Sequence, residues 1–118
     1  MDQSLAGEQY CYLTTTGRAS GEPREIEIWF GLKGSTVYLL SGGGDRSNWV
    51  RNLLADPAVT VRIADQSSRG RARIVDPGDE DALARRLVVD KYAEGYSGDL
   101  SDYERNALPV AIDLEDPA

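Results

Sequence analysis

Six short stretches of the chain carry the pattern of β-strands, and turn residues separate them. In residues 24–30, Ile26, Ile28 and Phe30 alternate with Glu25, Glu27 and Trp29, so that one face of the strand is apolar. Runs rich in aromatic and β-branched residues predict further strands over 9–15, 36–41, 58–63, 69–75 and 108–114. Because short turns join the early strands, antiparallel pairing is favoured.

Three segments between these strands carry helical patterns. The first begins after Asp45 or Ser47, either of which can cap it, and ends near Ala55. Its apolar stripe consists of Trp49, Val50, Leu53 and Leu54. The second lies within 77–96, starts with acidic residues and has its apolar positions at Leu83, Leu87, Val88 and Tyr92. A shorter helix is predicted over 100–107.

The element order is therefore β-β-β-α-β-β-α-α-β. It predicts the α+β class, with a small antiparallel β-barrel of about six strands and helices packed outside. The length of 118 residues suits one compact domain that spans 1–118. Residues 115–118 are expected to fray.

The net charge of −7 is unevenly distributed along the chain. Residues 1–75 hold nine Lys and Arg against eight Asp and Glu, whereas residues 76–118 hold four against twelve. An acidic total argues against nucleic acid and against anionic membranes as partners, because both bind basic surfaces. No apolar run approaches the roughly 20 residues that span a bilayer, and the start lacks a signal-peptide pattern. A cytoplasmic location is therefore expected.

The chain has no histidine and a single cysteine, Cys11. The usual general base near neutral pH, the Ser-His triads and most zinc sites are thereby excluded, and no metal site is predicted. The single cysteine cannot form an internal disulfide, which suits a reducing compartment. If the chain is an enzyme, a bound organic cofactor would carry its chemistry.

Two glycine-containing loops are candidates for binding an anion. Residues 41–44 precede the first predicted helix, where glycine lets a ligand approach the backbone and the helix start offers N–H groups. A mobile connection is the alternative. The loop within 14–24 has polar groups that suit a phosphate or carboxylate, carried by Arg18, Ser20, Gly21 and Arg24. An ordinary hairpin loop with solvated arginines is the alternative there.

Aromatic side chains suggest a second kind of site. Trp29 lies on the polar face of its strand and must pack against a helix, a partner chain or a ligand. Tyr92, Tyr96 and Tyr103 gather in the C-terminal helical region and could line an apolar pocket with hydroxyl groups at hand. Core or interface packing is the alternative. The arginines of residues 69–73 are expected to face solvent near the acidic helix.

Taken together, the stretches LTTTGRASGEPREIEIWF and YLLSGGGDRSNWVRNLLADPAVTVRI resemble the deazaflavin-dependent nitroreductase family, a branch of the split β-barrel flavin-binding superfamily. The likeness runs from about Tyr12 to Pro117. Its markers are the TGRxSGxPR loop, Ser-x-Gly-Gly after a strand, the W-x-x-N-L-x-A-x-P helix ending, and the Tyr-rich segment before LPVAI. The resemblance implies a split β-barrel.

It also implies an 8-hydroxy-5-deazaflavin coenzyme, F-420. The polyanionic tail of the coenzyme would bind at Arg18, Ser20, Gly21 and Arg24. Its ring system would lie along Ser41, Gly42, Gly43 and Gly44. Trp49 and Asn52 match cofactor-binding positions on the helix that follows, and Tyr92 and Tyr96 match catalytic positions on the substrate side. A tyrosine hydroxyl or solvent would supply the proton that accompanies hydride transfer.

The activity implied is hydride transfer from the reduced coenzyme to a small apolar acceptor: a quinone, an enone or a nitroaromatic. The family often has Lys at the positions of Ala19 and Gly42, which keeps FMN as an alternative cofactor. Two other functions remain open: a non-catalytic protein that binds a flavin, a deazaflavin or a lipid, and a split-barrel interaction module without a ligand. Split-barrel relatives are often homodimers, which favours a homodimer here.

Overall fold

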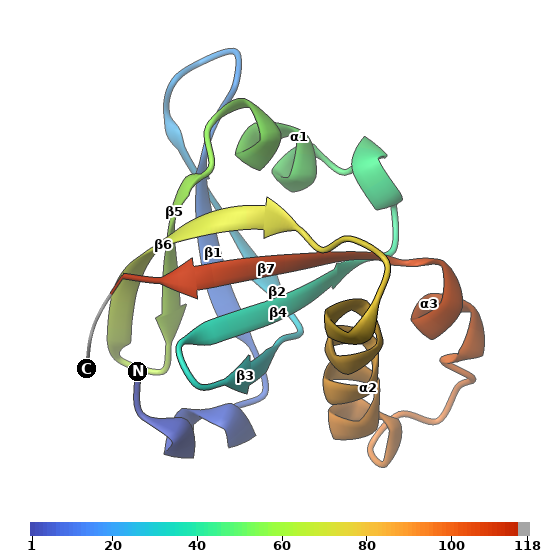
Figure 1. Cartoon of the computed structure of the whole chain (residues 1–118). Coiled ribbons are helices and arrows are strands. Elements are labelled where there is room, and N and C mark those ends of the chain that lie inside the picture. The colour runs from blue at the N-terminus through green and yellow to red at the C-terminus, as the bar shows by residue number, and fades with distance from the viewer. Residues whose placement is uncertain (116–118) are drawn as a thin grey trace.

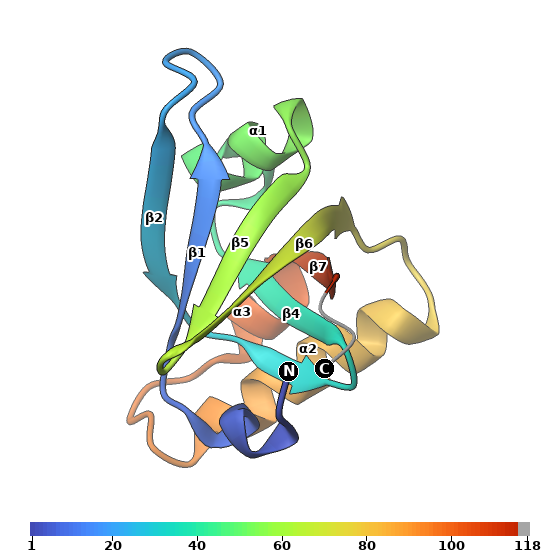
Figure 2. The same ribbon diagram turned by 90° about the vertical axis from the view of Figure 1, so that its left-hand side faces the viewer.

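In the computed structural model, seven strands form one antiparallel sheet that curls into a half-barrel (Figures 1 and 2). The strand order is β2-β1-β5-β6-β7-β4-β3, so that β2 and β3 are the two edges. The strands are β1 (Cys11–Thr16), β2 (Pro23–Ile28), β3 (Gly31–Lys33), β4 (Thr36–Ser41), β5 (Ala58–Ile63), β6 (Gln66–Ile74) and β7 (Leu108–Leu114). The structure describes residues 1–115, so most of the tail expected to fray, 116–118, lies outside the described residues.

Three α-helices lie against this sheet. They are α1 (Asn48–Ala55), α2 (Asp79–Ala93) and α3 (Ser101–Asn106), and short 3-10 turns cover Gln3–Gly7 and Gly44–Arg46. Helix α1 packs at one end of the half-barrel against β1 and β6, whereas α2 packs against β3, β4 and β7 and contacts α3 (Figure 1). In the part of the chain that the structure describes, no helix is long and apolar enough to cross a membrane.

The sheet has a hydrophobic core on each face. Leu13, Phe30 and Val61 belong to the core inside the half-barrel. Leu40, Val88 and other residues form a second core between the sheet and α2. Strand β4 serves both cores, because its side chains alternate between the two faces. This explains why its central residues 37–40 are all apolar instead of alternating with polar ones.

The α+β class and the antiparallel half-barrel are confirmed, with two corrections of detail. Residues 1–115 form seven strands rather than about six, because the chain bends at Trp29 and Phe30 and β3 then pairs with β4 instead of β1. Leu54, expected on the apolar stripe of α1, is 58% exposed. Trp29 packs within its own chain, stacked on Tyr92 of α2 at 4.3 Å between ring centroids.

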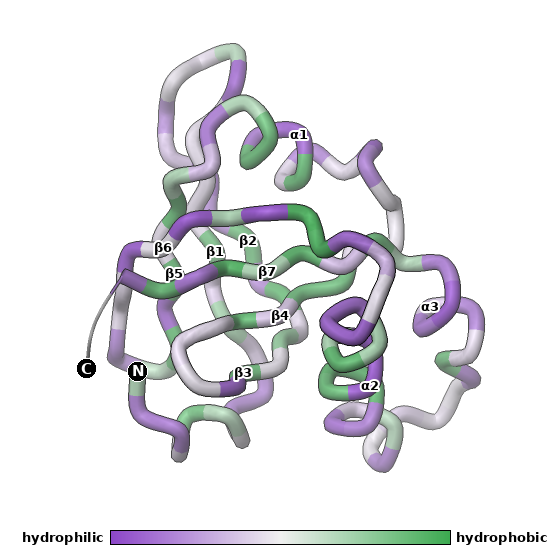
Figure 3. The backbone as a smooth tube through the Cα atoms, in the orientation of Figure 1, coloured by the Kyte–Doolittle hydropathy of each residue, from purple (hydrophilic) through white to green (hydrophobic). Residues whose placement is uncertain are grey.

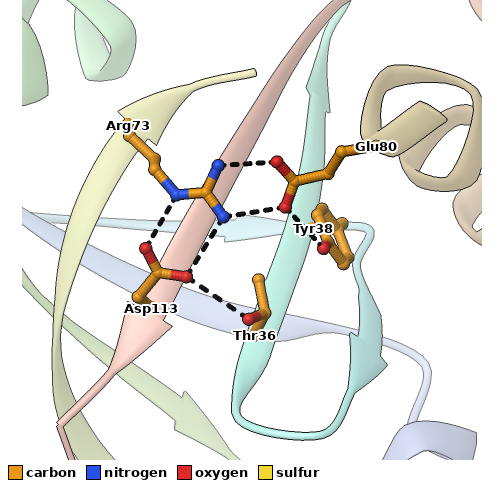
Figure 4. Close-up of polar contacts among 5 residues, drawn as sticks. All are labelled: Thr36, Tyr38, Arg73, Glu80 and Asp113. Carbon is orange, nitrogen blue, oxygen red and sulfur yellow. Dashed lines mark hydrogen bonds and ion pairs between the residues drawn. The ribbon is translucent and has the colours of Figure 1, made fainter. Parts of the chain in front are cut away.

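An ionic network fastens the start of α2 to the sheet (Figure 4). The Arg73 guanidinium on β6 donates to both carboxylate oxygens of Glu80 at 2.7 Å and to Asp113 of β7 at 2.7 and 3.3 Å. The Tyr38 hydroxyl donates to Glu80 at 2.8 Å, and the Thr36 hydroxyl donates to Asp113 at 3.3 Å. In the second half of β6 the exposed arginines alternate with Gly70, Ala72 and Ile74 (Figure 3), so the arginines lie on the face expected from the sequence.

Candidate functional site

A cleft of about 680 Å³ opens between α1 and the hairpin formed by β1 and β2. We call it the arginine cleft, and it is lined among others by Arg18, Ser20, Arg24, Asn48, Trp49 and Asn52. Five of these residues were predicted from the sequence as cofactor-binding positions. They come from two segments that are separate in sequence, 18–24 and 49–52, and the fold brings them to one opening.

Arg18 is held in this cleft by two asparagines of α1. The Asn52 carboxamide oxygen accepts from the Arg18 backbone N–H at 3.2 Å and from its guanidinium at 2.8 Å. The Asn48 carboxamide oxygen accepts from the other guanidinium nitrogen at 3.2 Å. Asn52 is only 5% exposed and donates to the Thr15 hydroxyl at 3.2 Å, so the anchor itself is fixed.

The loop between β1 and β2 is tightly folded around Gly17. The Gly17 N–H donates to the Glu22 carbonyl at 2.8 Å, and the Gly21 N–H donates back to the Gly17 carbonyl at 2.8 Å. A Cβ at Gly17 would lie 2.6 Å from the Ser20 hydroxyl oxygen, so only glycine fits without a shift. The Ser20 hydroxyl accepts from the Arg24 guanidinium at 3.2 Å, which holds Arg24 at the cleft. Gly21 shapes this loop but does not line the arginine cleft.

The glycine triplet lies apart from the arginine cleft. The Ser41 hydroxyl is buried and donates to the Gly44 carbonyl at 2.9 Å, and it shares a second hydrogen bond with the Ser47 hydroxyl at 2.8 Å. Of the three glycines, Gly44 has a positive φ, +63°. A Cβ at Gly42 would meet the Tyr103 ring at 3.9 Å, an ordinary contact. The cofactor-binding role of residues 41–44 stays a prediction.

A second cleft of about 640 Å³ lies between the end of β2 and the α3 region. We call it the aromatic cleft, and its aromatic lining consists of Tyr10, Trp29, Tyr96 and Tyr103. The rings of Tyr96 and Tyr103 stand nearly perpendicular to Trp29, with centroids 5.7 and 5.9 Å from it. The Tyr103 hydroxyl donates to the Leu40 carbonyl at 3.1 Å, whereas Tyr96 is 47% exposed.

Tyr92 supports this cleft from beneath and does not line it. Its side chain is 6% exposed and stacks on the face of Trp29 with an interplanar angle of 5°. Its hydroxyl donates to the Gln9 carbonyl at 2.8 Å and accepts from the Phe30 N–H at 3.1 Å. Burial raises the pKa of the Tyr92 phenol to about 12. These contacts favour a packing role, and the catalytic role predicted for Tyr92 stays a prediction.

Strand β2 forms part of the wall of both clefts. Residues 23–26 face the arginine cleft and residues 27–29 face the aromatic cleft. Because β2 pairs with β1 on one side only, its other edge is free of sheet pairing in the described chain. A long, flat ligand that extends along this edge would reach both clefts.

Sequence reasoning missed several lining residues. Asn48 could have been found, because it lies four residues before Asn52 and therefore on the same side of α1. Glu27 could not have been assigned, since an exposed acidic residue on a strand usually only faces solvent. Tyr10 and Asp102 reach the aromatic cleft through the folding of distant segments, and no local pattern indicates it.

Comparison with known proteins identifies the family. The sequence model of the F420H2-dependent quinone reductases matches residues 1–115; F420H2 is the reduced form of coenzyme F-420. The F420H2-dependent quinone reductase Rv1261c of Mycobacterium tuberculosis is 29% identical over an alignment of 104 positions, which covers 85% of this chain and 69% of the relative.

Solved structures agree with this match. A structure described as an F420-H2 dependent reductase, FDR-A, is 26% identical with a TM-score of 0.70 and covers 91% of this chain and 94% of its own. Another relative, described as a domain-swapped dimer, is also 26% identical, with a TM-score of 0.70 over 91% and 80% of the two chains. The conserved hypothetical protein Rv2991 from M. tuberculosis shares the fold, with a TM-score of 0.76 at 20% identity over 98% of this chain and 82% of its own.

The family match decides between the alternatives left by the sequence. It supports an enzyme rather than a non-catalytic binder or an interaction module, coenzyme F-420 rather than FMN, and a quinone-like acceptor. With residues 1–115 covered, the chain belongs to the F420H2-dependent quinone reductase family, whose members transfer hydride from the reduced deazaflavin coenzyme.

Proposed function

We propose that the arginine cleft binds the anionic tail of the reduced deazaflavin coenzyme and that the aromatic cleft holds the quinone that receives the hydride. The observation that carries this proposal is the position of β2, which walls both clefts and connects them. Volumes of about 680 and 640 Å³ are typical of pockets for small ligands. The coenzyme, when bound, supplies a hydride from its reduced ring.

The donor set of the arginine cleft fits an anionic group. Arg18 and Arg24 form no ion pair with a carboxylate among residues 1–115. Arg18 is already oriented by Asn48 and Asn52, so little side-chain entropy is lost when an anion binds. Arg24 has one hydrogen bond, to Ser20, which leaves other guanidinium donors for a phosphate or carboxylate.

The aromatic cleft suits a flat apolar acceptor. Its floor is the Trp29 ring, and the tyrosines 96 and 103 flank it. A quinone becomes a hydroquinone when it takes up one hydride and one proton, so a proton donor is needed besides the coenzyme. Tyr10 and Tyr96 both line the cleft with hydroxyls that donate to no protein group in the described chain, and Tyr96 is the better placed because its ring contacts Trp29, 5.7 Å between centroids.

The proposed tail site is tested by Arg24→Ala. We expect the dissociation constant of the deazaflavin coenzyme, measured by fluorescence titration, to rise at least severalfold, because a charge-assisted hydrogen bond is lost. The melting temperature should change little, since Arg24 is exposed and bonded only to Ser20. Arg86→Ala, on the exposed face of α2, is the matched control. Unchanged affinity in the Arg24 variant would place the tail elsewhere.

Titration of the unmodified protein with FMN should give a higher dissociation constant than titration with the deazaflavin coenzyme.

The proton donor is tested by Tyr96→Phe with menadione as acceptor. If Tyr96 delivers the proton, kcat should fall by about tenfold or more while KM changes little, because the ring stays in place. Tyr10→Phe, which removes a second hydroxyl from the same cleft, is the control and should keep kcat. An unchanged kcat in both variants would argue for solvent as the donor.

We also propose a homodimer. The support is the relative described as a domain-swapped dimer. Light scattering coupled to size-exclusion chromatography gives the mass directly, and the mass of one 12.9 kDa chain at micromolar concentration would contradict the proposal.

A further inference from the structure

We propose that the aromatic cleft selects its acceptor by charge: cationic and neutral quinones are accepted, and anionic quinones are rejected. This inference rests on the proposed function, because it takes the aromatic cleft as the acceptor site. It assigns a selecting role to three carboxylates, those of Glu27, Asp99 and Asp102, which line the cleft. Specificity of this kind comes from a repulsive element as well as an attractive one.

The first support is the arrangement of the rings. Trp29 is flanked by Tyr96 and Tyr103 at interplanar angles of 87° and 88°, which gives the cleft a floor and two aromatic sides. Aromatic faces carry negative electrostatic potential and attract organic cations, most strongly for tryptophan. The opposite face of Trp29 is covered by Tyr92, so the Trp29 ring is fixed in position.

The second support is that two of the three carboxylates, those of Glu27 and Asp99, are held at the cleft by hydrogen bonds. Glu27 accepts from the Tyr12 hydroxyl at 2.7 Å. Asp99 accepts from the Ser101 backbone N–H at 2.9 Å and from its hydroxyl at 2.5 Å, and these bonds lower the pKa of the Asp99 carboxyl. Asp102 is paired only through a long contact of 3.4 Å to the exposed Arg105.

No basic residue offsets these charges within the lining of the aromatic cleft. Two arginines contact these carboxylates or their partners without lining the cleft: Arg62 lies over the Tyr12 ring, 4.2 Å from its centroid, and Arg105 lies 3.4 Å from Asp102. The arginine cleft has the opposite balance, with Arg18 and Arg24 against the single carboxylate of Glu25. The two ends of β2 therefore differ in charge. An anionic tail is drawn to one end and repelled from the other, which leaves the acceptor site clear.

The binding part of the inference can be tested without coenzyme. Trp49→Phe leaves Trp29 as the only tryptophan, so its fluorescence reports on the aromatic cleft. The probes are benzyltrimethylammonium, neutral neopentylbenzene and phenylmethanesulfonate, which share one shape and differ in charge. We expect the cation to bind about tenfold or more tightly than the anion at low salt, and the difference to shrink at high salt. Equal or tighter binding of the sulfonate would overturn the inference.

The turnover part uses three naphthoquinones that carry trimethylammonium, tert-butyl or sulfonate at the end of the same two-carbon spacer. The spacer keeps the charge away from the ring, so the quinones have matched redox properties. Each takes up one hydride and one proton and becomes the hydroquinone, while the coenzyme is oxidised by two electrons. We expect kcat/KM to fall in the order cation, neutral, anion.

Removing the three charges should abolish this order. The variant Glu27→Gln, Asp99→Asn, Asp102→Asn keeps an acceptor oxygen for Tyr12 and for Ser101, so the fold should persist. The control removes three exposed carboxylates that do not line the cleft, with Asp65→Asn, Asp76→Asn and Asp90→Asn. Both changes raise the net charge by three, and only the first should remove the discrimination.

The outcomes separate this inference from the proposed function. Equal kcat/KM for all three quinones in the unmodified protein would overturn the charge selection and leave the proposed function standing. If the cation binds at Trp29 but none of the quinones is reduced, the placement of the acceptor fails and the charge preference of the cleft stands. Loss of discrimination in both triple variants would show a general field of the protein instead of a role for the three named carboxylates, and would also overturn the inference.

Discussion

Asn52 joins three parts of the molecule through one small side chain. Its carboxamide oxygen accepts two hydrogen bonds from Arg18, and its NH₂ group donates to the Thr15 hydroxyl. The residue is buried on α1, so these groups cannot exchange their partners for water without opening the loop. The position of Arg18 in the arginine cleft therefore depends on a residue outside its own loop.

Asn52→Ala should lower the free energy of unfolding by about 1–3 kcal/mol, because buried partners lose their hydrogen bonds. Urea denaturation measures this change. Asn48→Ala is the comparison, and it should lower the free energy of unfolding by less, because Asn48 is exposed. A variant with Ala at position 52 as stable as the unmodified protein would contradict this account of the loop.

Asn52→Asp separates stability from charge at the same site. A carboxylate still accepts from Arg18, and the Thr15 hydroxyl can turn to donate to its second oxygen in place of accepting from the lost NH₂ group. The guanidinium therefore keeps its place, but its positive charge is then paired. Binding of the deazaflavin coenzyme should weaken severalfold, while the melting temperature stays close to that of the unmodified protein. Fluorescence titration of this variant measures the dissociation constant of the coenzyme, and thermal denaturation measures its melting temperature. Undiminished affinity would indicate that the charge of Arg18 is not used.

At the scale of elements, helix α2 is fastened to the sheet by Arg73 in addition to its apolar contacts. Two carboxylates from different elements, Glu80 of α2 and Asp113 of β7, share this guanidinium (Figure 4). The hydrogen bonds from Arg73 and from Tyr38 lower the pKa of Glu80 to about 2. The part of the network that involves Glu80 stabilises the folded protein only while Glu80 is ionised.

Arg73→Ala should reduce the free energy of unfolding by about 1 kcal/mol at neutral pH, since partly exposed ion pairs contribute modestly. Because the pKa of Glu80 is depressed in the folded state, its contribution is complete above the ordinary value of 4.5 and is lost as the pH falls to about 2. The stability difference between variant and unmodified protein should narrow over this range. Arg71→Ala, on the same strand without an ion pair among residues 1–115, should show no such dependence.

The regular elements were predictable where a pattern repeats. Strands β1, β5 and β7 and helices α1, α2 and α3 lie within a few residues of the positions indicated by the sequence. Strand β3 was missed because it has three residues, and its pairing with β4 is decided by the bend at Trp29 and Phe30. The 3-10 turn at Gln3–Gly7 has no periodicity, although Asp2, which accepts from the Ser4 N–H, is a capping signal.

Part of the lining of the arginine cleft was predictable from the sequence, but the layout of the cleft was not. Arg18, Arg24 and Asn52 share a cleft because the β1–β2 loop folds towards α1, which no local spacing reveals. The glycine triplet was predicted from its sequence to bind an anion or the coenzyme ring, yet it does not line the arginine cleft. The role of Tyr92 depends on what its hydroxyl contacts, and those partners, Gln9 and Phe30, are more than sixty residues away.

At the scale of the whole molecule, three tyrosines couple folding to alkaline pH. Burial raises the pKa of Tyr38, Tyr92 and Tyr103 to about 12, from an ordinary value of 10. The folded state therefore holds more protons than the unfolded chain between these values. The stability gained from the neutral phenols is complete below pH 10 and is lost as the pH rises towards 12.

We expect the free energy of unfolding to fall in this range by up to about 1.4 kcal/mol per pH unit for each tyrosine. Chemical denaturation at a series of pH values measures the slope, and Tyr38→Phe should make it shallower. A free energy of unfolding that stays constant up to pH 12 would contradict the burial of these phenols.

The sharing of β2 between two clefts has a consequence for how such a molecule can diverge. Helix α1 contributes side chains only to the arginine cleft, and the α3 region contributes only to the aromatic one. Mutations on either helix can therefore change the binding of one ligand without affecting the binding of the other. A substitution on the shared strand β2 changes both clefts at once. Substitutions that alter the preference for an acceptor should therefore accumulate in the segment 96–103 and be rare on β2.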